Sequence, residues 1–106
     1  MSRSAIAQTR IHIPMDALAE LCRRYQVREL SLFGSVLRDD FRDDSDIDIL
    51  VEFEPEARIG FFELARLQRE LASILGREID IVPKLGLNPV IRRSVLESSE
   101  VIYAAR

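Results

Sequence analysis

The order in which glycine, serine and two aspartates follow a strand pattern constrains this chain more than any other feature. Val27–Phe33 alternates apolar and polar residues, with one slip, and stops at Gly34 and Ser35. After a spacer of ten residues, Asp46 and Asp48 open a second segment that is rich in β-branched residues. The pattern therefore predicts a strand, a tight turn, a spacer and a second strand that begins with two carboxylates.

The second strand, Ile47–Phe53, is predicted to point alternate side chains to opposite sides of a sheet. Carboxylates two residues apart then share one side, where they can hold one or two Mg²⁺ ions together with the phosphates of a nucleotide. The side with the carboxylates is expected to carry Asp46, Asp48, Leu50 and Glu52, and the opposite side Ile47, Ile49, Val51 and Phe53.

A third carboxylate, Asp80, lies in another predicted strand, Glu78–Val82, with apolar residues on both sides. Buried surroundings are unusual for an unpaired aspartate. Three carboxylates that meet across two strands form the arrangement that two-metal phosphoryl or nucleotidyl transfer needs. Each also has a purely structural interpretation: Asp46 as a turn cap, Asp48 as the partner of an arginine, and Asp80 as the end of an edge strand.

Gly34 and Ser35 stand where the first strand is expected to lead into a short helix that ends near Phe41. The free backbone amides of that helix and the Ser35 hydroxyl could converge on a phosphate, which glycine would allow to approach closely. A Gly-Ser pair at the end of a strand is, however, usually an ordinary turn. Arg38, three residues further on, could contact the nucleotide phosphates or hold the loop that carries Asp46.

Periodicity elsewhere predicts further helices and strands and indicates an α/β (α+β) fold: a small mixed sheet with helices packed against it. We expect one domain, residues 14–106, after an N-terminal tail, residues 1–13. The other expected elements are a helix over 15–25, a long amphipathic helix from about 62 to 75 closed by Gly76, a helix capped by Asn88 that runs to about 98, and a last strand over 101–104.

The composition excludes several classes of protein. The chain has 106 residues, 47% of them hydrophobic, which suits one domain with a modest core. A net charge of −3 argues against direct binding of nucleic acid. No apolar run is long enough to cross a membrane, and the single cysteine, Cys22, reads as a half-buried structural thiol of a reducing compartment. We therefore expect a cytoplasmic protein without nucleic-acid or membrane partners.

A calcium-binding loop is the other metal site that this stretch could suggest. Asp44, Asp46 and Asp48 imitate the first three ligand positions of an EF-hand. Ile49 stands where that loop needs glycine, and Pro55 where it needs a bidentate glutamate. The EF-hand interpretation therefore fails.

Three segments together resemble the minimal nucleotidyltransferases of the DNA polymerase β superfamily. The likeness extends from about Leu18 to Tyr103, and its signature is specific because all the parts occur in the required order. The segments are Leu32-Phe33-Gly34-Ser35-Val36-Leu37-Arg38, Ser45-Asp46-Ile47-Asp48-Ile49-Leu50-Val51 and Glu78-Ile79-Asp80-Ile81-Val82.

The resemblance implies a role for each motif residue. Gly34 and Ser35 would hold the triphosphate of ATP, Asp46 and Asp48 would bind Mg²⁺, and Asp80 would complete the site and help to activate the acceptor hydroxyl. Short members of the family are similar to antitoxins of two-gene modules. Such antitoxins transfer AMP to a tyrosine of a HEPN-type ribonuclease toxin, which implies that toxin as the partner here.

Three other functions are compatible with parts of this pattern. An aminoglycoside nucleotidyltransferase resembles the chain at the site but usually carries a further helical domain. A glycosyltransferase with an Asp-x-Asp pair would need a larger fold. A non-catalytic antitoxin could cover its partner with the acidic stretch 39–56 and the apolar C-terminal segment, although it would have no reason to keep three like charges together.

Overall fold

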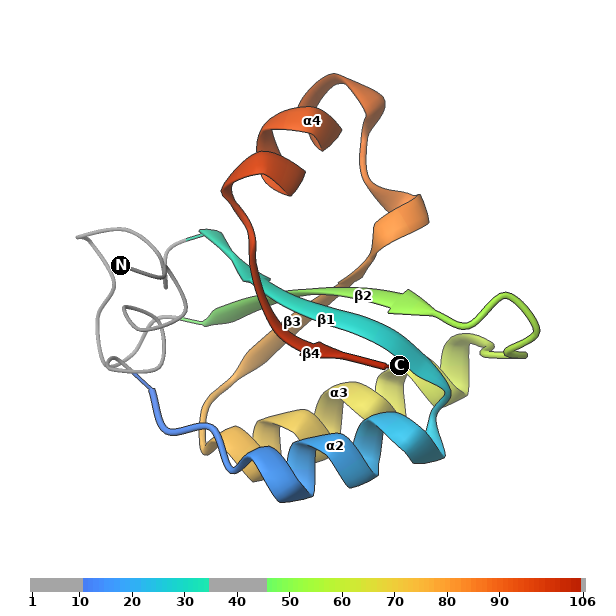
Figure 1. Cartoon of the computed structure of the whole chain (residues 1–106), viewed down its shortest axis with the longest axis vertical. Coiled ribbons are helices and arrows are strands. Elements are labelled where there is room, and N and C mark those ends of the chain that lie inside the picture. Colours follow the sequence, from blue (N-terminus) through green and yellow to red (C-terminus); the bar gives the residue numbers. More distant parts are fainter. Residues whose placement is uncertain (1–10, 35–45, 106) are drawn as a thin grey trace.

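A computed structural model of the chain describes residues 11–34 and 46–105 (Figure 1). Helices and strands alternate along most of the described chain. In chain order the elements are helix α2 (Met15–Arg24), strand β1 (Val27–Phe33), strand β2 (Ile47–Phe53), helix α3 (Phe61–Leu75), strand β3 (Ile79–Pro83), the 3₁₀ turn η2 (Lys84–Gly86), helix α4 (Pro89–Ser98) and strand β4 (Glu100–Ala104).

The four strands form one mixed sheet in the order β3-β2-β1-β4. β1 is antiparallel to β2 and to β4, whereas β2 and β3 are parallel. A parallel pair needs a crossover connection, and α3 supplies it. β2 therefore lies inside the sheet, with the end of β1 on one side of its first residues and the start of β3 on the other.

One face of the sheet carries the hydrophobic core. Helices α2 and α3 lie side by side against this face (Figure 1), because each presents an apolar stripe to it. The apolar stripes of the two helices consist of Leu18, Leu21, Cys22, Leu67, Leu71 and Leu75. The buried residues of the central strands beneath these helices are Leu30, Leu32, Ile47, Ile49 and Val51.

Local sequence signals account for the ends of the helices. Pro14 precedes the first turn of α2, and its carbonyl accepts the Leu18 N–H at 3.0 Å. Gly76 ends α3 in the left-handed region, with φ at 68°, and the Asn88 side chain accepts the Val90 N–H at 2.9 Å at the start of α4. Within the described residues, the expected helices and strands are confirmed to within about two residues at each end.

Leu50 shares the predicted side of β2 with Asp48 and Glu52 and is only 3% exposed. The η2 turn contacts β2, and Leu87, which directly follows η2, is buried too. One expectation about burial is corrected. Cys22, predicted to be half-buried, is completely buried, and this burial raises the pKa of its thiol to about 12. It is an unreactive core side chain.

Helix α4 is peripheral. None of its residues, all of which the structure describes, is buried, and in Figure 1 the sheet separates it from α2 and α3. Among the described residues, no helix is long and apolar enough to span a membrane.

A hydrogen-bonded cluster ties the C-terminal end of α2 to the middle of α3. The Tyr25 hydroxyl donates to the Glu70 carboxylate, and the Arg24 guanidinium lies 3.4 Å from the same carboxylate. The hydrogen bond from Tyr25 lowers the pKa of Glu70, and burial together with that bond raises the pKa of Tyr25. The bond therefore needs a protonated tyrosine and an ionised glutamate.

Replacing Tyr25 by phenylalanine should lower the free energy of unfolding by about 1 kcal/mol, since the bond is to a charged but partly exposed carboxylate. The loss should be full between the ordinary pKa of glutamate, 4.5, and that of tyrosine, 10.0. It should shrink as acid protonates Glu70 and as alkali ionises Tyr25. Urea unfolding of both proteins at pH values from below 4.5 to above 10.0 measures the difference in free energy of unfolding. A difference that does not vary with pH would contradict the prediction.

Candidate functional site

Gly34 is in contact with the carboxylate of Asp48. It directly follows β1 with φ at +79°, in the region that favours glycine. A Cβ atom placed on Gly34 would lie 2.2 Å from Oδ2 of Asp48 and 3.1 Å from its Cγ. Backbone conformation and close approach therefore both require glycine here, and the carboxylate lies directly over the end of β1.

Asp48 and Asp80 are neighbours across the parallel pair of strands. They are Cα partners in the register of β2 and β3, so their side chains leave the sheet on the same side. On the other side of β2, Asp48 is the Cα partner of Phe33, the last residue of β1. The sheet thus places Asp48 between Gly34, which follows β1, and Asp80 on β3, and the roles assigned to these residues stay predictions.

The three aspartates differ in exposure. Asp46 precedes β2 and is exposed, Asp48 is half-buried, and Asp80 is exposed. The expectation that Asp80 sits in buried surroundings is wrong, because its apolar neighbours Ile79 and Ile81 point to the opposite face and are buried there. An exposed Asp80 is open to a molecule that approaches the sheet from outside.

Two predicted site residues, Ser35 and Arg38, lie outside the described residues, as does the short helix expected up to Phe41. Of the predicted phosphate-binding turn, the structure describes Gly34. The roles of Ser35 and Arg38 stay predictions.

The donor set suits a magnesium ion only if substrate completes its coordination. Within residues 11–34 and 46–105, no three side chains of His, Cys, Asp or Glu gather closely enough to hold a metal by themselves. Mg²⁺ prefers carboxylate oxygens, commonly takes one or two of them and fills the rest of its shell with water and phosphate oxygens. Asp48 and Asp80, two like charges on adjacent strands, match that need.

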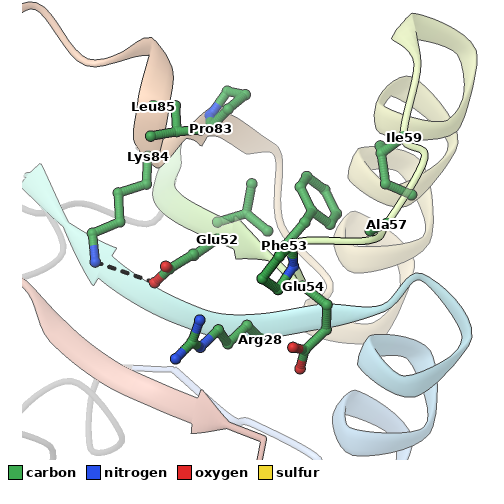
Figure 2. A pocket seen from close by; sticks show the side chains of 11 residues that line it. Arg28, Glu52, Phe53, Glu54, Ala57, Ile59, Pro83, Lys84 and Leu85 are labelled. Carbon is green, nitrogen blue, oxygen red and sulfur yellow. Dashed lines mark hydrogen bonds and ion pairs between the residues drawn. The ribbon is translucent and has the colours of Figure 1, made fainter.

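A pocket of about 430 Å³ lies at the opposite end of β2 (Figure 2). It contains the ion pair between Lys84 and Glu52, whose Nζ and Oε1 atoms are 3.2 Å apart. Glu52 is four residues beyond Asp48, so the pocket is about 13 Å along the strand from the aspartates. The sequence did not predict this pocket, because its walls come from β1, β2, the loop that follows β2, the end of β3, and η2, and no single motif spans them.

Comparison with known proteins places the chain among nucleotide-using enzymes. The profile of a family described as "nucleotidyltransferase domain" matches residues 15–102. The protein adenylyltransferase MntA of Thermococcus cleftensis is 39% identical over 84 residues, which cover 79% of this chain and 81% of that protein. A protein of Methanocaldococcus jannaschii, proposed to be a protein adenylyltransferase, is 40% identical over 85 residues, which cover 78% of this chain and 82% of that protein.

Solved structures share the fold. One, proposed to be a minimal nucleotidyltransferase, superposes with a TM-score of 0.67 at 34% identity and covers 93% of this chain and 94% of its own. A toxin–antitoxin complex with AMP-PNP gives 0.69 at 22% identity, with 89% and 76% covered. A complex of the MNT antitoxin with a tri-AMPylated HEPN toxin of Shewanella oneidensis gives 0.61 at 22% identity, with 86% and 70% covered. At 22% identity the likeness is one of fold.

The contact between Gly34 and Asp48 can be tested by stability. Gly34→Ala should lower the free energy of unfolding by about 2–3 kcal/mol, because the added methyl group meets the carboxylate as well as a left-handed backbone. Gly76→Ala is the matched control: its φ is +68°, but nothing lies within 4 Å of the added Cβ, so only the backbone cost of about 1 kcal/mol applies.

Combining Gly34→Ala with Asp48→Ala isolates most of the steric part, since truncation removes the two atoms nearest the methyl group, Oδ2 and Cγ, and leaves only the Asp48 Cβ, at 3.3 Å. In the Asp48→Ala background, Gly34→Ala should therefore cost only slightly more than Gly76→Ala, whose cost is about 1 kcal/mol. Equal costs of Gly34→Ala in the two backgrounds, measured by chemical unfolding, would show that the contact does not constrain position 34.

Proposed function

The chain belongs to the family of nucleotidyltransferase domains, and from that premise we propose that it transfers AMP from ATP to a hydroxyl group of a partner protein. The partner would be a HEPN-type toxin and the acceptor a tyrosine, so that the chain is the antitoxin of a type VII-like toxin–antitoxin module in the cytoplasm. The observation that carries the proposal is the convergence of Gly34, Asp48 and Asp80 from three strands on one side of the sheet.

Relatives support the substrate class. The T. cleftensis relative, with 39% identity, is a protein adenylyltransferase. Among the structures with the same fold, one toxin–antitoxin complex holds AMP-PNP and another contains an AMPylated HEPN toxin. ATP as the nucleotide and a protein hydroxyl as the acceptor are therefore the substrates that we assign.

In the proposed reaction, the oxygen of the acceptor hydroxyl attacks the α-phosphorus of ATP. The bond between that phosphorus and the oxygen that bridges to the β-phosphorus breaks, and pyrophosphate leaves. Asp80 takes the hydroxyl proton, a role that suits its exposed position at the edge of the site. Gly34 leaves room at the end of β1 for the Asp48 carboxylate, and the turn that begins with Gly34 would, with Ser35 and Arg38, bind the phosphate oxygens.

Asp46, Asp48 and Asp80 would hold the magnesium ions. Bound Mg²⁺ would neutralise charge on the triphosphate and on the leaving pyrophosphate. The chain's own contribution is to hold Asp48 in place: Gly34 lies beneath its carboxylate, and hydrogen-bonded strands flank it on both sides. The division into a tail, residues 1–13, and a domain, residues 14–106, belongs to the same proposal.

The decisive experiment follows transfer of label from α-³²P-ATP, with Mg²⁺ present, to the protein encoded beside this chain. Asp46→Asn/Asp48→Asn should reduce the transfer rate by about 10²–10⁴-fold, because several kcal/mol of metal-dependent stabilisation would be lost. The control Asp16→Asn/Glu20→Gln removes the same charge from exposed positions of α2 and should leave transfer unchanged.

Full transfer by the Asp46→Asn/Asp48→Asn variant would disprove the assigned roles of these aspartates. A partner that receives no label from the unaltered chain, yet is still bound and inhibited by it, would instead support a non-catalytic antitoxin.

Removal of the metal is an independent test. Chelation with EDTA should stop transfer, and added Mg²⁺ should restore it, because the carboxylates alone cannot screen the triphosphate. The melting temperature of the chain without nucleotide should stay the same in EDTA, since apolar contacts between the helices and the sheet form the core. Undiminished transfer in EDTA would exclude the metal-dependent mechanism.

A further inference from the structure

The pocket at the far end of β2 has the features of a site for a protein segment. Its volume, about 430 Å³, is within the usual range of ligand sites, roughly 300–1,000 Å³. Its floor and walls are mainly apolar and its rim is charged, which is how protein-binding surfaces are commonly built (Figure 2). The apolar wall residues that matter here are Phe53, Ala57, Ile59, Pro83 and Leu85.

The edge of the sheet is open at this pocket. The Ile47 N–H donates to the carbonyl of Glu78 at 2.9 Å, so the odd-numbered residues of β2 direct their backbone groups toward β3. β3 ends at Pro83, the Cα partner of Val51, and the chain then turns into η2. The backbone groups of Phe53, two residues further, therefore face a side along which no described strand extends.

Among the described residues, four charged side chains line the rim of the pocket: two form an ion pair with each other and two do not. Lys84 and Glu52 neutralise each other at 3.2 Å. Within the described part of the chain, neither the guanidinium of Arg28 nor the carboxylate of Glu54 has an ion pair, although both line the pocket (Figure 2). The rim thus offers one cation and one anion to an incoming molecule.

Apolar surface continues outside the pocket. Leu85, on η2, is 90% exposed. Beyond Ile59, Phe61 and Phe62 are each 79% exposed at the start of α3, with their rings packed edge to face at 5.8 Å. Exposed aromatic and aliphatic side chains beside a pocket are typical of a protein interface rather than of a small-molecule site.

We propose that this pocket docks the acceptor protein by an extended segment, with an apolar side chain in the pocket, a carboxylate on Arg28 and a basic group on Glu54. The segment would continue the edge of β3 along Phe53. The proposal rests on the proposed function, because the acceptor there is a protein. It adds a site that recognises the partner, about 13 Å along β2 from Asp48. The aspartates by themselves, on short strands and with Asp80 exposed, do not provide such recognition.

Affinity for the partner, without ATP, tests the docking separately from transfer. Titration calorimetry with the protein encoded beside this chain should show a Kd raised about 100-fold by Ala57→Trp, which fills the pocket, and about 10-fold by Arg28→Glu. Arg69→Glu makes the same charge change at an exposed position of α3 outside the pocket and should leave Kd unchanged. Melting temperatures of all variants check that they fold.

Transfer kinetics give the second measurement. The two pocket variants should raise KM for the partner and leave kcat at saturation unchanged, whereas Asp46→Asn/Asp48→Asn should reduce transfer by about 10²–10⁴-fold and keep Kd. Unchanged Kd and KM in both pocket variants would overturn the docking proposal and leave the transfer proposal intact. The docking proposal would also be overturned if the unaltered chain did not bind the partner. A Kd that depends on the pocket, in a chain that transfers no AMP, would support docking and refute the transfer.

Discussion

The carboxylate of Asp48 lies over the end of β1, and this close contact governs the rest of the site. A Cβ atom at position 34 would be 2.2 Å from Oδ2, so the chain can turn away from β1 at this point only with glycine. Since β2 pairs with both β1 and β3, the same residue also lies beside Asp80. One side chain thus connects the predicted phosphate-binding turn to the predicted metal ligands.

The chain can place charged groups this close together because the hydrophobic core lies on one face of the sheet and the polar site on the other. Helices α2 and α3 bury one face and supply the core, and the Tyr25–Glu70 hydrogen bond joins the end of one to the middle of the other. Because α2 and α3 pack against one face of the strands, polar side chains can project from the opposite face without weakening the core. An exposed Asp80 follows from this division, whereas buried surroundings would have closed it to a large acceptor.

In our two proposals, nucleotide chemistry and partner recognition are separated along β2 in the same way. The aspartates lie at its first residues, and the pocket with Arg28 and Glu54 lies at its last. Such a small domain has little surface around the proposed catalytic residues with which to select a protein acceptor. A second contact at the other end of the strand would supply selectivity without altering the chemistry, because rigid strands fix the distance between them.

The sequence alone determined the alternation of helices and strands, the residues at which helices begin and end, and the shared side of Asp48 and its neighbours, because these depend on local periodicity and capping. It also identified Gly34, Asp46, Asp48 and Asp80 as candidates, since the motif order is specific. Its error at Asp80 arose because flanking isoleucines show only that a strand is half-buried, not which face a given residue occupies. Only the tertiary structure decided the strand order, the burial of Leu50, and the pocket, because each depends on residues that are distant in sequence and meet only when β2 is placed between β1 and β3.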